Sequence, residues 1–464
     1  MKITSEETNF IDAMTAKYNG YAYMYAEYPN KSYWKTMHDQ NDYVDAINRL
    51  TNYWPEKPSQ LYIHLPFCPN ICHFCSCYRL KPQNYGEVKD FLFYIIKELQ
   101  LLKQIITNNS VSANFKTIHL GGGSPSFLKE EEFTLLRNTL NELVPIASLD
   151  EFAIEIDPRH VDIDRLEFYH TLGINRISFG IQDFDPIVQK AVNRLQPINL
   201  VERLLTPRIR SLFKSISFDV LYGLPKQTLD SFMKTIDKVI ELNPSRVVLL
   251  SFNFSPESNE NQRNIQAHDL PGDKEKLEMF YKSTERLLAK NYVKVGLEHF
   301  SSPDDNLATI WKSGDFNWNM SGYHKGNANK IIGIGPGSCS RITDDYYFQN
   351  IKPLDQYKAY LLAGRLPIHK GYKLTEDDLI RREVTIQLRS RLVLDIDSIE
   401  NRFKIRFDKY FNKEITFLDE FEKDGIIRRE NHKLVLTDLG APFTSFVCMV
   451  FDAYCNKNER VSIC

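Results

Sequence analysis

The chain has 464 residues, of which 42% are hydrophobic and 25% are charged, and its formal net charge at pH 7 is -2. This composition is typical of a globular protein, and the length accommodates one large α/β domain and a smaller one. A net charge so close to zero argues against a nucleic acid or an anionic membrane as partner. The sequence shows neither a signal peptide nor a run of about 20 apolar residues, so we expect a cytoplasmic protein without a transmembrane segment.

Residues 1–57 form a polar N-terminal arm that is rich in tyrosine. One interpretation is that its amphipathic rings pack against the main domain. The other is that the arm is a lid over the mouth of an active site. The tyrosines crowd together ahead of Trp34, at Tyr18, Tyr21, Tyr23, Tyr25, Tyr28 and Tyr33.

A short apolar run after the arm predicts a strand, and the loop behind it holds four of the eight cysteines. Three of them, Cys68, Cys72 and Cys75, have the spacing C-x3-C-x2-C. Iron–sulfur clusters are normally held by four thiolates, so three thiolates in one loop suit a cluster with one open iron. A closed zinc site that recruits Cys77 or His73 is one alternative, and cysteines without any ligand are another.

From this strand onward, apolar segments alternate with amphipathic segments in the pattern of a parallel sheet with crossover helices. Residues Val88 to Ile106, for example, repeat their apolar side chains at helical spacing. Six strands, with a possible seventh at Lys294–Leu297, are too few for a closed eightfold barrel. We therefore predict an α/β fold with a partial (β/α)6-type barrel over residues 58–350. The predicted strands are Leu61–Leu65, Thr117–Leu120, Phe152–Ile156, Arg176–Phe179, Ser217–Leu221 and Val247–Phe252.

The carboxyl ends of these strands carry glycines and polar side chains, and chemistry in such sheets is located there. Gly121–Gly123 allow backbone groups to approach a ligand closely, although a triple glycine is also a common tight turn. Glu155 alternates with apolar neighbours and points into the barrel, unless that strand face is exposed to solvent. Gln182 suits a ribose and Arg194 a carboxylate, although singly each is more often a surface residue. Asp219 lies within a strand and needs a hydrogen-bond donor as partner.

The alternation stops near Pro353, and residues 351–464 predict a separate C-terminal domain. Helices followed by a hairpin and a final helix after Gly440 resemble a winged-helix module. The region has no basic stripe, so we expect a cover for the barrel mouth and no contact with DNA. The helical patterns span Asp377–Leu392, Ile396–Phe403 and Lys413–Asp424, and the strands span Ile426–Glu430 and Lys433–Leu436.

Tyr62, the cysteine loop, Gly121–Gly123 and Glu155 together resemble the radical S-adenosylmethionine (SAM) superfamily, and more closely its oxygen-independent coproporphyrinogen III dehydrogenase family. The resemblance runs from about Lys17 to about Tyr454 and includes the blocks 155–159, 179–184, 222–227, 299–305 and 446–454. It implies a [4Fe-4S] cluster whose open iron chelates SAM. Reduction of the cluster then cleaves SAM to methionine and a 5′-deoxyadenosyl radical, so an electron donor such as flavodoxin or ferredoxin is implied too.

Carried over residue by residue, the resemblance implies a metal site and two SAM sites. The cluster ligands are Cys68, Cys72 and Cys75. Cys77 and Tyr25 are candidates to move a proton or a hydrogen atom in the last step of the reaction. The first SAM is held by Tyr62, Gly122, Gly123, Ser124, Glu155, Gln182, Arg194 and Asp219. A second SAM, which relatives of this family bind, falls at Phe74, Cys77, Asn253, Ser321 and Cys339.

The chain departs from the dehydrogenase pattern on the substrate side. The family signature Arg-Tyr-Thr-Ser-Tyr-Pro is replaced by residues 24–29, so that Met24 stands for the arginine and Glu27 adds an acid. A substrate with four carboxylates favours cations in its lid, so this exchange argues against coproporphyrinogen. Asn253 and Ser321 replace the alanine and glutamine that the family has beside the second SAM.

This profile is similar to that of class C radical SAM methyltransferases. Our main expectation is therefore the methylation of an sp2 carbon in an aromatic or quinone ring, for example menaquinone, with two SAM molecules. The alternative is oxidative decarboxylation of a tetrapyrrole, coproporphyrinogen III, to protoporphyrinogen IX. A cluster-bearing haem carrier or chaperone is a third, non-catalytic hypothesis.

Overall fold

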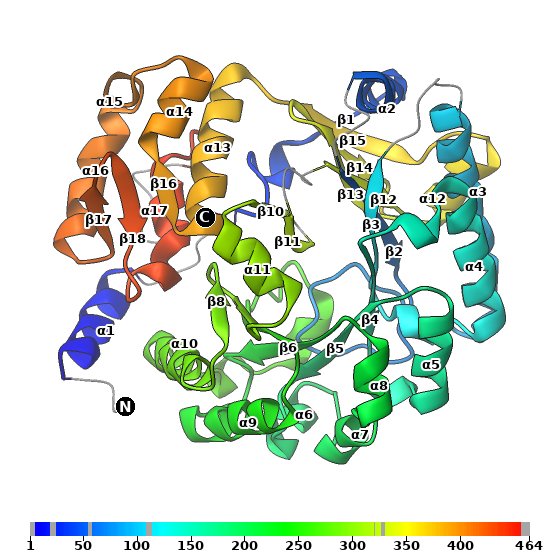
Figure 1. Ribbon diagram of the computed structural model, residues 1–464, viewed down its shortest axis with the longest axis horizontal. Helices are drawn as coiled ribbons and strands as arrows, with labels where there is room; N and C mark the ends of the chain where they lie inside the picture. The colour runs from blue at the N-terminus through cyan, green and yellow to red at the C-terminus, as the bar shows by residue number, and fades with distance from the viewer. Residues whose placement is uncertain are drawn as a thin grey trace.

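One curved sheet of thirteen strands organises the protein (Figure 1). The computed structural model describes residues 5–18, 25–53, 58–107, 114–319, 321–325 and 330–455. The predicted strands are confirmed and lie side by side in parallel in chain order. They are β2 (Ser59–Leu65), β3 (Phe115–Gly122), β4 (Glu151–Ile156), β5 (Arg176–Gln182), β6 (Ser215–Tyr222) and β7 (Arg246–Ser251).

Crossover helices cover the outer face of the parallel strands, as the alternating pattern predicts (Figure 1). In the helix that follows β2, the apolar residues at helical spacing, such as Phe91, Ile95 and Leu99, are at most 1% exposed. On β4 the side chains of Phe152 and Ile154 are fully buried, which leaves the opposite strand face for the barrel interior. The helices are α3 (Tyr85–Thr107), α4 (Glu130–Leu143), α5 (Ile163–Thr171), α8 (Pro207–Leu212) and α9 (Leu229–Leu242).

The sheet stays open and does not close into a barrel. At one edge an antiparallel pair follows β7, and at the other edge a further strand parallel to β2 is followed by antiparallel strands. The possible seventh strand forms β8 (Val293–Val295), which pairs with β9 (His299–Ser301), and β9 runs antiparallel to β7. The other edge continues from β2 through β12 (Lys330–Ile334), β13 (Cys339–Thr343), β14 (Tyr346–Asn350), β15 (Ile368–Lys373) and β1 (Lys35–Thr36). Strands β1 and β15 thus belong to this sheet, and the boundaries at residues 57 and 350 stay predictions.

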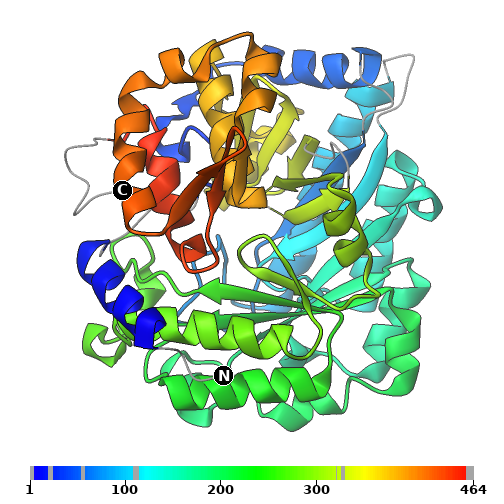
Figure 2. The same cartoon turned by 60° about the vertical axis from the view of Figure 1, so that its left-hand side comes forward.

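The C-terminal region folds as expected into helices around a small sheet with its own hydrophobic core. Figure 2 shows it to one side of the main sheet. None of the helices in the described parts of the chain is long and apolar enough to cross a bilayer. The elements of the C-terminal region are α13 (Glu376–Arg391), β16 (Val393–Asp395), α14 (Ile396–Phe403), α15 (Phe407–Tyr410), α16 (Asn412–Lys423), β17 (Ile427–Glu430), β18 (Lys433–Leu436) and α17 (Thr444–Val450).

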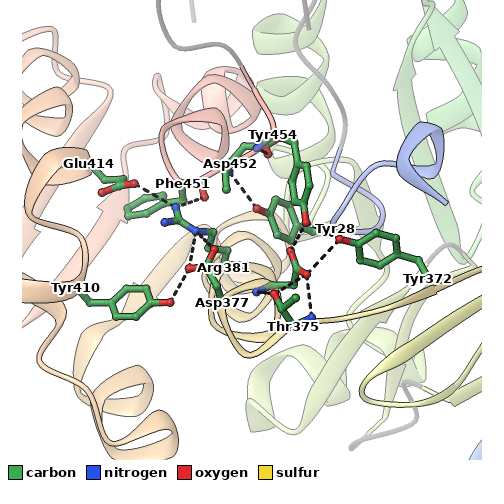
Figure 3. A network of polar contacts seen from close by, with 12 residues as sticks. Tyr28, Tyr372, Thr375, Asp377, Arg381, Tyr410, Glu414, Phe451, Asp452 and Tyr454 are labelled. Carbon is green, nitrogen blue, oxygen red and sulfur yellow. Dashed lines mark hydrogen bonds and ion pairs between the residues drawn. The ribbon is translucent and has the colours of Figure 1, made fainter. Parts of the chain in front are cut away.

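A group of hydrogen bonds, here called the α13 network, joins the arm, the start of α13 and the end of the described chain (Figure 3). The backbone N–H of Ala453 donates to the Tyr28 hydroxyl over 3.1 Å, and the Tyr454 hydroxyl donates to Asp378 Oδ1 over 2.8 Å. Arg381 Nη1 donates to the Phe451 carbonyl over 2.9 Å. In the described part of the arm, Tyr18 and Tyr28 therefore contact the C-terminal region, whereas Trp34 stacks on Tyr347 of the main sheet. The packing interpretation named the main domain alone, so the observed contacts differ from it in part.

Candidate active site

The cysteine loop follows β2 directly and is held in place through its backbone. Cys68 N donates to the carbonyl of Leu80 over 2.9 Å. Asn261 Nδ2 lies 3.0, 2.8 and 2.9 Å from the carbonyl oxygens of Cys72, His73 and Cys75. Because these bonds use main-chain groups, the three thiols remain available to a ligand. No local sequence signal points to Asn261, which lies far along the chain from the cysteines that it holds.

Two guanidinium groups lie beside the thiols. Arg194 Nη1 is 3.5 Å from Cys72 Sγ, and Arg159 Nη2 is 3.8 Å from the same atom. Asp157 ties the two together, at 3.1 Å from Arg194 and 2.6 Å from Arg159. Although burial opposes ionisation of Asp157, these two arginines lower its pKa. Cations next to sulfur favour thiolates, which are the form that binds metal.

The thiols differ in how readily they lose a proton. Burial raises the pKa of Cys68 to about 12, whereas a hydrogen bond from the Cys77 side chain lowers that of Cys75 to about 7. The same hydrogen bond raises the pKa of Cys77, whose side chain is exposed where the loop meets the neighbouring cavities. Three thiols in one loop, with two arginines alongside, are a donor set that fits a [4Fe-4S] cluster with one open iron.

A cavity of about 170 Å³ lies beside these thiols at the carboxyl ends of the strands. The residues predicted to hold the first SAM meet there, although they come from five different strands or loops. Tyr62 is the exception, because it lines the neighbouring cavity instead. Lining the small cavity are Cys68, Cys72, Phe74, Cys75, Cys77, Gly122, Gly123, Ser124, Glu155, Gln182, Arg194 and Asp219.

The glycines are required by close packing at this rim. Gly122 has a left-handed backbone with φ of +109°, and a Cβ there would lie 2.7 Å from the His64 ring. A Cβ on Gly123 would lie 2.5 Å from the carbonyl oxygen of Pro66. Gln182 also adopts positive φ, at 66°, where the pairing of β5 with β6 shifts its register. Such a backbone is unfavourable for a side-chain-bearing residue and clusters at functional sites.

Two carboxylates face the cavity with opposite tendencies to ionise. Glu155 accepts hydrogen bonds from His119 Nε2 at 2.9 Å and from Gly122 N at 3.2 Å. Although burial opposes its ionisation, the bond from His119 lowers the pKa of Glu155. Burial and the charge of Glu155 raise the pKa of Asp219 to about 6, while the Ser178 hydroxyl donates to Asp219 over 3.0 Å. Glu155 is thus the stable anion of the pair at neutral pH.

A second cavity, of about 570 Å³, occupies the interior of the partial barrel. It shares Cys77, Gly122, Glu155 and Asp219 with the small cavity, so the two spaces meet at these residues. Its walls combine apolar side chains with cations from three places. The apolar side chains are Val248, Leu250 and Trp318. The cations are Lys31 of the arm, Arg176 of β5 and Arg246 of β7.

The residues predicted for a second SAM are only partly brought together. Cys77, Ser321 and Cys339 line the large cavity, and Phe74 lines the small one. Asn253 lines neither, and its carbonyl accepts a hydrogen bond from Gln262 Nε2 over 3.2 Å.

Tyr25, predicted to be catalytic, is buried in the α13 network. Its hydroxyl donates to Asp452 Oδ2 over 2.9 Å, and it lines neither cavity. Its position therefore gives no support to a role in proton or hydrogen transfer.

Comparison with known proteins agrees with this site along nearly the whole chain. Residues 62–239 match the model of the radical SAM superfamily, and residues 374–443 match that of the HemN C-terminal domain. The oxygen-independent coproporphyrinogen III oxidase of Synechocystis sp. is 34% identical, covering 99% of this chain and 98% of that protein. The enzyme of Pseudomonas aeruginosa is 36% identical over 87% of each chain.

A solved structure gives the same result. Coproporphyrinogen III oxidase (HemN) from Escherichia coli, described as a radical SAM enzyme, superposes with a TM-score of 0.85 and 31% identity. The match covers 93% of this chain and 97% of that one. The chain belongs to the oxygen-independent coproporphyrinogen III oxidase family. It is a radical SAM enzyme, and membership of this family implies a [4Fe-4S] cluster and SAM.

The expected closeness to class C methyltransferases is wrong, and methylation of a quinone or aromatic ring is overturned as the main function. The relatives that match over nearly the whole chain are oxidases, and the C-terminal region matches the HemN domain. The structure explains why the substitutions on the substrate side pointed to the wrong substrate. Glu27 is 4% exposed and pairs with Lys31 at 3.3 Å, and Lys31 lines the large cavity. The arm therefore brings a cation to the cavity, while Met24 lies outside the described residues and Asn253 lines neither cavity.

Proposed function

We propose that the protein is an oxygen-independent coproporphyrinogen III oxidase, which converts propionate side chains of the tetrapyrrole by oxidative decarboxylation to yield protoporphyrinogen IX. The observation that carries the proposal is the junction of the two cavities at Cys77, Gly122, Glu155 and Asp219. A cofactor in the small cavity and a substrate in the large one would meet there. The nearly full-length similarity to coproporphyrinogen III oxidases supports this choice of substrate.

The chain's own residues divide the work. Cys68, Cys72 and Cys75 would hold the cluster, and the strand-end residues of the small cavity would hold SAM. When bound, the cluster and SAM supply one-electron chemistry that removes a hydrogen atom from the substrate. Glu155, an anion held by His119 and Gly122, is suited to accept hydrogen bonds from a ribose or an ammonium group.

The large cavity suits a tetrapyrrole with carboxylate side chains. Trp318, Val248 and Leu250 offer apolar surface to the macrocycle. Lys31, Arg176 and Arg246 bring positive charge to the wall, and a substrate carboxylate would share these cations with their partners Glu27, Glu151 and Asp305. A second SAM in this cavity would lie against Cys77, Ser321 and Cys339. Cys77 faces both cavities, so its thiol is suited to donate a proton or hydrogen atom there. An electron donor such as flavodoxin or ferredoxin belongs to the same proposal.

The test is anaerobic turnover of the reconstituted protein with reductant, SAM and coproporphyrinogen III labelled with ¹⁴C in the propionate carboxyl groups. We expect labelled carbon dioxide, together with 5′-deoxyadenosine, methionine and a product that oxidises to protoporphyrin IX on chromatography. Substrate-independent 5′-deoxyadenosine without carbon dioxide would reject this substrate but keep the radical SAM site. A protein that forms neither product would instead support the carrier hypothesis.

A further inference from the structure

Four charged or polar side chains form a continuous chain of contacts along the inner face of the sheet. Glu151 and Glu155 are four residues apart on β4, so both point to the same side of the strand. Ala153 lies between these two glutamates on β4. Its register partners on the neighbouring strands are His119 of β3 and Arg176 of β5. The order of contacts is Glu155, His119, Arg176 and Glu151, at 2.9, 3.3 and 2.9 Å.

The contacts fix which nitrogen of His119 carries its proton. Arg176 Nη2 lies 3.3 Å from His119 Nδ1, and a guanidinium group donates hydrogen bonds but accepts none. His119 Nδ1 is therefore the acceptor, and in the neutral ring the proton is on Nε2. That N–H donates to Glu155 Oε1 over 2.9 Å. Arg176 is itself held by Glu151, at 2.9 Å from its Nε.

We propose that His119 is a positioning residue for SAM, which orients the Glu155 carboxylate toward the small cavity and whose tautomer is set by Arg176. His119 acts through Glu155, because it lines the large cavity and not the small one. Gly122 N holds the other carboxylate oxygen, so the two donors together fix the plane of the group. The inference rests on the SAM site proposed above, but not on the identity of the tetrapyrrole.

Other groups near Glu155 do not offer an equivalent contact. Tyr62 and His64 of β2 are bonded to each other at 3.1 Å, and His64 Nε2 lies 2.8 Å from the Tyr78 carbonyl. Asp219 of β6 bears like charge when ionised and accepts from Ser178. Among these neighbours, His119 is the side chain with a hydrogen bond to Glu155.

The experiment measures SAM binding without substrate, by equilibrium dialysis of the anaerobically reconstituted protein with labelled SAM. His119→Leu removes both hydrogen bonds, and we expect the affinity to fall by about 10- to 100-fold, the range for a bond to a charged group. His119→Gln can accept from Arg176 and donate to Glu155, so the affinity should stay within about threefold of wild type. Iron content and the cluster absorbance verify that each variant is loaded.

A double-mutant cycle separates positioning from a structural role. In a Glu155→Gln background, His119→Leu should weaken SAM binding by less than about twofold, because the group it orients is already changed. An equal loss in both backgrounds would overturn the proposal, as would wild-type affinity in His119→Leu. If His119→Leu does not load with iron, His119→Met serves as the apolar variant in the same cycle. The SAM-binding assay contains no tetrapyrrole. A failure to release carbon dioxide in the turnover assay would therefore leave the result of the binding assay unchanged.

Discussion

The rim of the small cavity and the α13 network are both rich in buried polar groups, but they are built in different ways. At the rim, the functional groups follow strands within a few residues, and they face a cavity. In the α13 network, local pairs are combined with partners that are distant in sequence, such as Tyr28 and Ala453 across 425 positions, and the polar groups face each other (Figure 3). The first arrangement leaves groups available to ligands, and the second uses all of them to join parts of the chain.

Asp219 and Asp378 illustrate this difference. Asp219 accepts one hydrogen bond, from Ser178, and lines both cavities. Asp378 accepts bonds from the backbone N–H and the hydroxyl of Thr375 and from the hydroxyl of Tyr454, at 2.9, 2.7 and 2.8 Å. A carboxylate so fully satisfied stabilises the fold and has little capacity left for a ligand. Changes at the rim should therefore reduce activity, and changes in the network should reduce stability.

The largest expected effect separates two buried cysteines, one from each region. Cys72→Ala removes a proposed cluster ligand, so we expect no 5′-deoxyadenosine from SAM and reductant, while the urea midpoint of the metal-free protein stays at the wild-type value. Cys448 packs in the C-terminal core, where its thiol lies 3.8 Å from the Thr385 carbonyl. Cys448→Ala should keep its activity and lose about 1 kcal/mol of unfolding free energy. Activity in Cys72→Ala would refute the cluster assignment.

The same difference explains what could be predicted from the sequence. The cysteine loop, Gly122 and Glu155 were found because spacing, strand ends and alternation are local signals. Their gathering into one cavity follows from parallel strands whose carboxyl ends meet at one edge of the sheet. The fold was predictable for the same reason, except that the antiparallel edges depend on pairing between distant segments.

Contacts between distant segments were not predictable. Asn261 holds the cysteine loop from a position 186 to 189 residues away, and nothing in its neighbourhood indicates this role. A short-range pair was missed as well, because Glu27 binds Lys31 only four residues further along the chain and is not simply an anion added to a lid. The substrate was misjudged because substitutions were interpreted without knowing which of them line a cavity.

Arg381 provides a test of the network with a matched control. Its guanidinium binds Asp377 at 2.8 Å and Glu414 at 3.1 Å, and its side chain is 13% exposed. Arg381→Met leaves the buried Glu414 carboxylate, 8% exposed, without this cation, so we expect a loss of about 2–3 kcal/mol in urea unfolding. Arg402 of the same domain also has an ion pair and a ring contact, but its side chain is 51% exposed. Arg402→Met should therefore cost less than about 0.5 kcal/mol. Equal losses would show that burial does not determine the contribution.

Glu98 combines features of both regions, because it is buried and fully bonded but holds a loop next to the large cavity. It accepts hydrogen bonds from Gly335 N, Asn350 Nδ2 and the Tyr357 hydroxyl, at 2.9, 2.6 and 2.5 Å. Burial raises its pKa from 4.5 to about 7. The folded protein therefore keeps a proton there that the unfolded chain releases at lower pH, so the stabilising effect of that proton is lost as the pH rises toward 7.

The smallest expected effect is the pH dependence of a single hydroxyl at Glu98. Tyr357→Phe removes a bond to a neutral acid at pH 5 but to a carboxylate at pH 8, and bonds to charged groups are stronger. The loss in unfolding free energy should therefore be about 1 kcal/mol larger at pH 8 than at pH 5. Tyr292 is a matched control, because its buried hydroxyl donates to the Pro244 carbonyl at 2.7 Å. Tyr292→Phe should cost the same at both pH values. A pH-independent loss in Tyr357→Phe would show that Glu98 does not change its charge in this range.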